Sequence, residues 1–436
     1  MKSSLRIGLE TELFLINNKG KIANEADFVL KQLHKKEIMK KYVVQECGHN
    51  MIEVKASPSP FVSKTAHLLL QHMEKVQQVA EKHELSLLPL ATYPGKMTPL
   101  MRTDKKYNVK SEIFGEKRFL IAGRCAGFHC HYELPFTLPL VRNISLLQFL
   151  DLKHEHALVN GYNTMIAMDP ALTTFMQSSP FYQGKHLAKD SRMLMYRGSP
   201  ALKCAQSLYH NYEEFGQLPG YKHSLFEVIE MVEEKYHDWK KSILKVGMNI
   251  KTLSHYGSFL DTAWNPVKIN KLGTLEQRGM DMNYPGHFIA AAALIKATVK
   301  RISDENLKII PSDLGTKKPF TVEDGHLFVP QERFIHKTLQ VHSAYAGIEN
   351  TYMQTYCKAV FNFAKKDLKG KNRRILRPFA TMLTEQRTIS DEVLLYAKKK
   401  GWEKGTDLQQ KTAEEIALHY AEQLKKEIPT SLKQIA

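Results

Sequence analysis

The chain begins with an alternation of polar and apolar residues, which predicts a β-strand over residues 5–16 and a turn over residues 17–20. Farther along, apolar residues recur at the spacing of one helix face. That periodicity predicts helices over residues 27–41, 62–84, 144–166, 226–246 and 284–300, with more helices from about residue 340 onward.

Strand patterns occupy several of the gaps between these helices. Residues 43–55 indicate a hairpin interrupted at Gly48-His49-Asn50, and residues 85–92 indicate an edge strand, because Pro89 cannot donate to a ladder. The remaining predictions are strands over 118–134 (around a break at Gly127) and 274–278, irregular chain over 170–180 and 257–273, and a turn-rich segment after Pro311. Without a regular βαβ alternation, this mixture favours an α+β fold with an antiparallel sheet.

Three of the predicted strands place unusual side chains on one face. Residues two apart on a strand point the same way, about 6.5–7 Å from each other. The pairs are Glu10 and Glu12, His129 and His131, and Glu276 and Arg278. Taken singly, each pair is also what a solvated sheet face shows. If the three faces line one cavity, they predict phosphoryl chemistry, because oxygen-rich sites bind Mg²⁺ or Mn²⁺ and arginine offsets charge on a transferred phosphoryl group.

The predicted hairpin adds two further carboxylates. If His49-Asn50 forms a two-residue turn, Glu46 lies directly opposite Glu53. Facing carboxylates repel each other unless a cation lies between them, so this register predicts a metal site. The alternative is a longer loop that shifts the register and leaves both carboxylates in water.

Bulk properties exclude several classes of protein. With 43% hydrophobic and 25% charged residues, the composition is that of a soluble globular protein. No apolar run approaches the roughly 20 residues that span a bilayer, and the start of the chain lacks a signal-peptide core. The five cysteines are scattered and form neither a disulfide framework nor a paired CxxC site. A reducing, cytoplasmic setting and no membrane contact are therefore expected.

The chain carries a formal net charge of +17 and a pI near 9.4. Such an excess is typical of proteins that bind nucleic acid or anionic small molecules. The alternative is a basic, solvated surface. The sequence has no RNA- or DNA-binding motif, so nucleic acid is not an expected partner. It also lacks a Walker A sequence, so nucleotide binding would depend on the sheet and metals. The Ser178-Ser179 pair lacks a GxSxG elbow and is predicted to position phosphate or substrate rather than act as a nucleophile.

Five segments, taken together and in order, resemble the glutamate–cysteine ligase type 2 family of the glutamine synthetase-like superfamily. They are Ile7-Gly-Leu-Glu-Thr-Glu-Leu, the Glu46…Glu53 hairpin, Gly127-Phe-His-Cys-His, Ser178-Ser-Pro-Phe-Tyr-Gln-Gly with Ser191-Arg192, and Gly273-Thr-Leu-Glu-Gln-Arg-Gly-Met-Asp281. The resemblance covers roughly residues 5 to 300. It implies a curved antiparallel sheet lined by the active site and backed by helices. We expect a catalytic domain over residues 1–335 and a C-terminal helical region over 336–436, packed on the core or on a second subunit in a homodimer.

The resemblance further implies two metal sites. One Mg²⁺ or Mn²⁺ ion, near the acceptor amine and the transferred phosphate, would be held by Glu12, Glu46 and Glu53. A second ion, against the ATP phosphates, would be held by Glu10, His129 and Glu276.

Basic side chains would contact the nucleotide. By the same resemblance, Arg278 contacts the γ-phosphoryl group, and Arg192 binds phosphate or the carboxylate substrate. Arg197 is a further candidate for the role of Arg192. His131 would contact phosphate or support the metal ligands, or else be hydrogen-bonded on the sheet face. The candidate catalytic residues are Glu53, Arg278 and Arg192.

The sequence departs from the family pattern in two places. Many members carry consecutive glutamates where this chain has Glu10-Thr11-Glu12, and valine and glycine often replace Cys130 and Tyr132. Cys130 should face away from the two histidines and lie in the core. These changes leave ATP and metal binding in place but leave the amine substrate open.

The implied reaction is ATP-dependent amide formation through an acyl phosphate. The substrates would be the γ-carboxylate of glutamate and cysteine or a related amine. A guanidino kinase-like phosphotransferase is the nearest alternative enzyme, although its substrate-binding cysteine motif is not evident. A non-catalytic nucleotide- or amino-acid-binding protein of the same fold is a second alternative. A nucleic-acid-binding protein is a third, which predicts strongly salt-dependent binding.

Overall fold

The computed structural model describes residues 5–255, 258–366 and 368–435. Within these ranges, seven strands form one antiparallel sheet in the order β2-β3-β1-β5-β9-β8, with β4 paired to the far end of β1. The strands are β1 Ile7–Asn17, β2 Val43–Gln45, β3 Met51–Lys55, β4 Leu85–Leu88, β5 Gly127–Glu133, β8 Val267–Asn270 and β9 Thr274–Asp281. The predicted α+β fold with an antiparallel sheet is confirmed.

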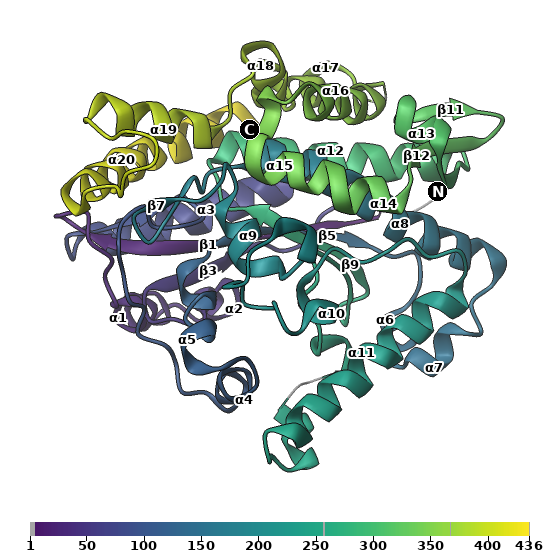
Figure 1. Ribbon diagram of the computed structural model, residues 1–436, viewed down its shortest axis with the longest axis horizontal. Coiled ribbons are helices and arrows are strands. Elements are labelled where there is room, and N and C mark those ends of the chain that lie inside the picture. Colours follow the sequence, from purple (N-terminus) through teal and green to yellow (C-terminus); the bar gives the residue numbers. More distant parts are fainter. Residues whose placement is uncertain (1–4, 256–257, 367, 436) are drawn as a thin grey trace.

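Helices cover the back of the sheet (Figure 1). Alternate residues of β1, such as Ile7, Leu9 and Leu13, are buried against them, while Glu10 and Glu12 point to the opposite face. The central helices on this side are α3 Val62–Glu81, α8 Leu152–Met176 and α12 Pro285–Asp304. The period-two pattern of β1 thus gives the sheet an apolar face, which is buried against the helices, and a polar face on the opposite side.

The C-terminal helices add a further layer on the same side (Figure 1). They are α15 Gln340–Ala346, α16 Thr351–Lys365, α17 Gly370–Arg374, α18 Arg377–Glu385, α19 Ile389–Lys399 and α20 Gln410–Ile435. Helix α20 packs on α3 and β4, and α16 packs on α8 and α12. Their apolar residues, including Phe361 and Leu424, belong to the hydrophobic core that surrounds the sheet. The division at residue 335 stays a prediction.

Another group of helices encloses the polar face of the sheet. They include α4 Lys105–Phe114, α5 Glu116–Phe119, α9 Ser191–Arg197, α10 Glu213–Gly216 and α11 Leu225–Lys245. A second hydrophobic cluster joins them through stacked and edge-on rings of Phe114, Tyr209, Phe215, Trp239 and Trp264. Among the described residues, the remaining α-helices are α1 Ala26–Leu33, α2 Glu37–Tyr42, α6 Leu138–Arg142, α7 Ile144–Leu147, α13 Asp313–Lys317 and α14 Glu332–Phe334.

Helix α8 contradicts the prediction of irregular chain after Pro170. The helix continues through Pro170 to Met176. Proline removes one helical hydrogen bond, but here the helix is buried from Leu158 to Met176 and neighbouring side chains hold it in place. Tyr356 donates its hydroxyl to the carbonyl of Ala167, and Thr174 donates to the carbonyl of Pro170 at 2.7 Å. Tertiary packing therefore overrides the local signal.

Three other local predictions are wrong. Residues 118–126 contain the end of α5 and a short 3₁₀ helix, and the strand begins only at Gly127. The segment predicted as irregular from residue 257 includes strand β8, whereas residue 257 itself lies outside the described residues. A small sheet of β10 Lys308–Ser312, β11 Thr321–Glu323 and β12 His326–Pro330 replaces the turn-rich segment. These elements are three to five residues long, too short for a hydrophobic period to reveal them.

Among the described residues, the helices are too short or too polar for any of them to cross a membrane.

Candidate active site

The polar face of the sheet forms the floor of a cavity of about 580 Å³. Strands β1, β3, β5 and β9 and the loop between β2 and β3 each contribute charged side chains to it. The predicted site residues that line this cavity are Glu10, Glu12, Glu46, Glu53, His129, Glu276 and Arg278. The three strand faces that the sequence paired separately therefore do converge.

The hairpin reaches the cavity by a different register from the predicted one. Val44, not Glu46, lies opposite Glu53, so the two-residue turn is wrong and the connecting loop is longer. Two contacts fix this loop: Asn50 donates its side-chain amide to the carbonyl of Gly123 at 2.9 Å, and Arg102 donates Nε–H to the carbonyl of Glu46 at 2.7 Å. The longer loop does not leave the carboxylates in water.

Glu12, Glu46 and Glu53 form a carboxylate triad. Glu12 lies directly opposite Glu53 on neighbouring strands, and Glu46 meets them from the loop. One carboxylate oxygen from each residue lies within 4.8 Å of the others. Burial and the neighbouring Glu53 and Glu12 raise the pKa of Glu46 well above its usual value. Three crowded carboxylates of this kind fit a Mg²⁺ or Mn²⁺ ion, which would offset their mutual repulsion.

This electrostatic crowding predicts how metal and pH affect stability. A carboxyl group whose folded-state pKa is raised contributes stability below its unfolded pKa and loses that contribution as pH rises through the folded pKa. We therefore expect the stabilisation by Mg²⁺, measured as the rise in Tm, to be larger at about pH 8 than at about pH 5, near the ordinary pKa of a carboxyl group. In Glu46→Gln this difference should shrink. Thermal unfolding with and without Mg²⁺ measures it, and an equal rise at both pH values would contradict the assignment.

His129 lies between the triad and a second acidic group. Its Nε2 is 3.6 Å from Glu12 Oε1, while its Nδ1 is 3.6 Å from Glu10 Oε2 and 3.9 Å from Glu276 Oε1. Nε2 of His129 and Nε2 of His131 are buried and have no hydrogen-bond partner among the described residues. His131 Nδ1 is 3.0 Å from Thr274 Oγ1, and its Nε2 is 3.6 Å from Glu10. Imidazole nitrogens without partners, beside carboxylates, fit a second divalent ion or a phosphate.

Charged neighbours keep the second acidic group ionised. Burial acts to raise the pKa of Glu276, but Arg278, His131 and Lys268 outweigh it and lower the pKa to about 2. Arg278 Nη1 lies 3.2 Å from Glu276 Oε1 and also faces the cavity. The guanidinium is therefore held in place while part of it stays available to a ligand.

Arg192 lies at the margin of the cavity, behind Gly127. Its guanidinium donates to the carbonyls of Gly279 and Arg278, each at 3.4 Å, and its Nε has no partner among the described residues. A Cβ on Gly127 would come within 2.3 Å of Arg192 Nη2, so only glycine permits this approach. The backbone N–H of Gly127 donates to Glu12, which places Arg192 close to the triad.

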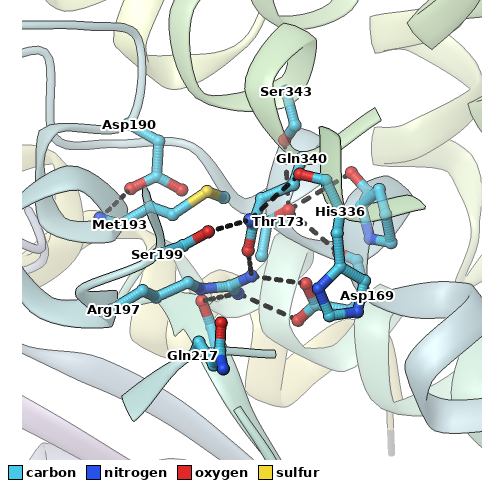
Figure 2. Close-up of polar contacts among 12 residues, drawn as sticks. Asp169, Thr173, Asp190, Met193, Arg197, Ser199, Gln217, His336, Gln340 and Ser343 are labelled. Carbon is cyan, nitrogen blue, oxygen red and sulfur yellow. Dashed lines mark hydrogen bonds and ion pairs between the residues drawn. The ribbon is translucent and has the colours of Figure 1, made fainter. Parts of the chain in front are cut away.

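Arg197 does not line the cavity. Its guanidinium donates two hydrogen bonds to the carboxylate of Asp169 (Figure 2). Nη1 lies 2.6 Å from Oδ2, and Nη2 lies 2.9 Å from Oδ1. It also donates to Gln340 at 3.0 Å and to the carbonyl of Gly279 at 3.4 Å. Because its donors are occupied by protein groups, we do not include Arg197 among the proposed phosphate contacts. It ties α9 to α8, α15 and β9.

The Ser178-Ser179 loop supports the end of β9. The Ser179 hydroxyl donates to Asp281 at 2.7 Å, and the backbone N–H of Ser178 donates to the same carboxylate at 3.0 Å. The loop thus positions the strand that carries Glu276 and Arg278. Cys130 lies in the hydrophobic core, away from the cavity, as predicted.

The sequence did not reveal the other walls of the cavity. Its apolar side is built from Tyr107, Phe119, Tyr196, Tyr209 and Trp264, and its basic groups include Lys55, Lys106, Lys110, Lys268 and Lys271. Lys110 Nζ lies 4.0 Å from the ring centre of Trp264. Most of these residues belong to loops and short helices with no motif. Only Lys55 carried a signal, since it stands two residues after Glu53 on the same strand.

Together, the acidic face of an antiparallel sheet, the carboxylate triad and the nearby guanidinium of Arg278 form a site suited to divalent ions and phosphoryl groups. The match to a family model makes this specific: the model of glutamate–cysteine ligase family 2 (GCS2) matches residues 6–324. The chain belongs to this family, whose members bind ATP and join a carboxylate to an amine.

Solved structures agree on the fold. Glutamate–cysteine ligase from Francisella tularensis, solved in complex with AMP, is 12% identical and superposes with a TM-score of 0.61 over 99% of this chain and 92% of its own. A bifunctional glutathione synthetase from Pasteurella multocida is 14% identical, with a TM-score of 0.56 over 98% of this chain and 52% of its own. The chain thus spans about half the length of the Pasteurella protein. No curated protein matches the sequence.

Proposed function

We propose that the protein joins the γ-carboxylate of glutamate to the amine of cysteine or a related compound, through an acyl phosphate formed from ATP. The observation that carries this proposal is the carboxylate triad of Glu12, Glu46 and Glu53 beside His129, Glu276 and Arg278 in one cavity. Family membership supports the reaction class. The particular carboxylate and amine are the proposal.

Different side chains would bind the metal ions, the phosphates and the substrate carboxylate. Glu12, Glu46 and Glu53 would hold one Mg²⁺ or Mn²⁺ ion, and Glu10, His129 and Glu276 a second. Bound ions supply charge neutralisation on the phosphates and alignment of donor with acceptor. Arg278 donates to the γ-phosphoryl oxygens, and Arg192 donates to phosphate or to the substrate carboxylate at the edge of the triad. His131 contacts phosphate or supports Glu10.

In the first step a carboxylate oxygen attacks the γ-phosphorus, and the bond to ADP breaks. In the second step the amine nitrogen attacks the carbonyl carbon of the acyl phosphate, and phosphate leaves. A carboxylate of the cavity accepts the proton released by the amine. The aromatic side of the cavity, with Tyr107, Tyr196, Tyr209 and Trp264, gives the amine's side chain an apolar wall and excludes water from the acyl phosphate.

A substrate scan tests this function. The protein is incubated with ATP, Mg²⁺ and glutamate while the amine is varied, and ADP, phosphate and the amide product are measured. We expect phosphate release that depends on the amine. ADP release without phosphate, in the presence of a guanidino compound, would indicate a kinase instead. If no pair of carboxylate and amine stimulates turnover while ATP still binds, the protein is a non-catalytic binding protein.

Glu276→Gln tests the second metal site. Removing this charge leaves Glu10 and His129 with a neutral third ligand and leaves Arg278 without its partner. We expect kcat to fall by roughly 10²-fold, with a higher Mg²⁺ requirement. Turnover measured against Mg²⁺ concentration checks this. Unchanged turnover in Glu276→Gln would remove Glu276 from the site.

A further inference from the structure

Lys55 is a lysine placed among the proposed metal ligands. It is the last residue of β3, two residues after Glu53, so both side chains point to the cavity. On the neighbouring strand β1 its cross-strand partner is Glu10. The sheet register therefore puts an ammonium group directly beside two of the six candidate ligands.

The contacts show where that ammonium lies. Lys55 Nζ forms an ion pair with Glu53 Oε1 and is 3.5 Å from Glu10 Oε1. Glu53 belongs to the triad, and Glu10 belongs to the group around His129. Lys55 Nζ thus lies at the junction of the two proposed ion sites. Its side chain is 33% exposed, whereas Lys425, in a surface pair with Glu81, is 49% exposed.

An ammonium at this junction does part of the work of a divalent ion. It neutralises carboxylate charge, it holds Glu10 and Glu53 at a fixed separation, and it offers donors to phosphate oxygens. Any ion that used Glu10 and Glu53 together would have to displace it. Unlike a metal ion, the ammonium of Lys55 is part of the protein and cannot dissociate, so its charge is present whether or not nucleotide is bound.

We infer that Lys55 is a protein-supplied cation of the phosphoryl-transfer site, which occupies the position between Glu10 and Glu53 and excludes a divalent ion from it. The chain then binds two divalent ions and supplies the neighbouring positive charge itself. The contribution to turnover rests on the proposed function, but the number of bound ions does not.

Ion counting tests the inference without relying on activity. Mn²⁺ is titrated into the protein with a non-hydrolysable ATP analogue, and the bound ions are counted by calorimetry and by electron paramagnetic resonance. We expect two ions in the wild type, in Lys55→Arg and in the surface control Lys425→Met. In Lys55→Met we expect a third ion. Circular dichroism checks that each variant is folded.

Two results would overturn the inference. One is three or more ions in the wild type, which decides the matter even if Lys55→Met fails to fold. The other is a folded Lys55→Met that binds the same number of ions as the wild type.

Turnover gives a second readout that separates this inference from the function. In Lys55→Met we expect the half-saturating Mg²⁺ concentration for ADP release to rise about tenfold, with activity recovering at high Mg²⁺. An unchanged Mg²⁺ requirement counts against Lys55. If the wild type turns over no carboxylate–amine pair at all, the proposed function fails, and the ion count still decides the role of Lys55.

Discussion

Replacing Glu53 by glutamine should abolish most amide formation and weaken metal binding, with a fall in kcat on the order of 10²-fold or more. Glu53 lies opposite Glu12, approaches Glu46 and pairs with Lys55, so it takes part in every proposed feature of the acceptor side. Glutamine keeps the shape and removes the charge that a divalent ion needs. ADP release under saturating substrates, together with Mn²⁺ affinity measured by calorimetry, checks this.

The matched control is Glu37→Gln, which changes the same residue type at a site on α2 where the side chain is 85% exposed. It should leave turnover and Mn²⁺ affinity unchanged. Glu53→Gln should still fold, because it relieves repulsion within the triad even as it loses the pair with Lys55. A folded Glu53→Gln variant with wild-type turnover would show that the triad does not hold a catalytic ion.

The polar faces of the sheet were predictable from the sequence because strand geometry has a period of two. Glu10 and Glu12 had to share a face once β1 was recognised, and so did His129 and His131 on β5. The sequence could not establish that these faces line one cavity, because the order of strands in a sheet depends on contacts between distant segments. The structure brings the faces together by placing β5 between β1 and β9.

For the hairpin, the sequence predicted a register that is wrong, yet Glu46 and Glu53 do lie close together. The sequence contains a plausible turn at His49-Asn50, but the side chain of Asn50 is buried and bonded to Gly123, far along the chain. No local pattern reports such a contact. Glu46 nevertheless reaches Glu53, because the longer loop brings one of its carboxylate oxygens within 4.8 Å of those of Glu12 and Glu53. Tertiary contacts fixed the loop, and they preserved the carboxylate cluster.

The family resemblance made Arg197 a further candidate for the role of Arg192, but its guanidinium is bonded to protein groups. It stands five residues after Arg192 on α9, and nothing in the sequence says which of the two lies nearer the carboxylate triad. The partner that decides the matter, Asp169, lies on α8 beside the unexpected helical Pro170. A buried ion pair between distant segments leaves no periodic signal.

The ion pair between Asp169 and Arg197 gives the second prediction with a large expected effect, a loss of stability. Asp169 and Arg197 are almost fully buried, with side-chain exposures of 0% and 3%, and Asp169 also accepts a hydrogen bond from Gln277 on β9 at 3.0 Å. Asp169→Ala leaves a guanidinium buried without its counter-charge. We expect a loss of about 3–5 kcal/mol in the free energy of unfolding. Urea unfolding followed by circular dichroism measures it.

An exposed pair and a paired replacement make this test specific. Asp407→Ala breaks the exposed contact with Lys96, where the side chains are 56% and 72% exposed, and should cost less than about 0.5 kcal/mol. The double variant Asp169→Leu with Arg197→Met removes both charges and should recover much of the loss, because the penalty comes from the unpaired charge. If Asp169→Ala unfolds like the wild type, Arg197 is not held by Asp169. It would then be free to turn toward phosphate, the role for which the family resemblance made it a candidate.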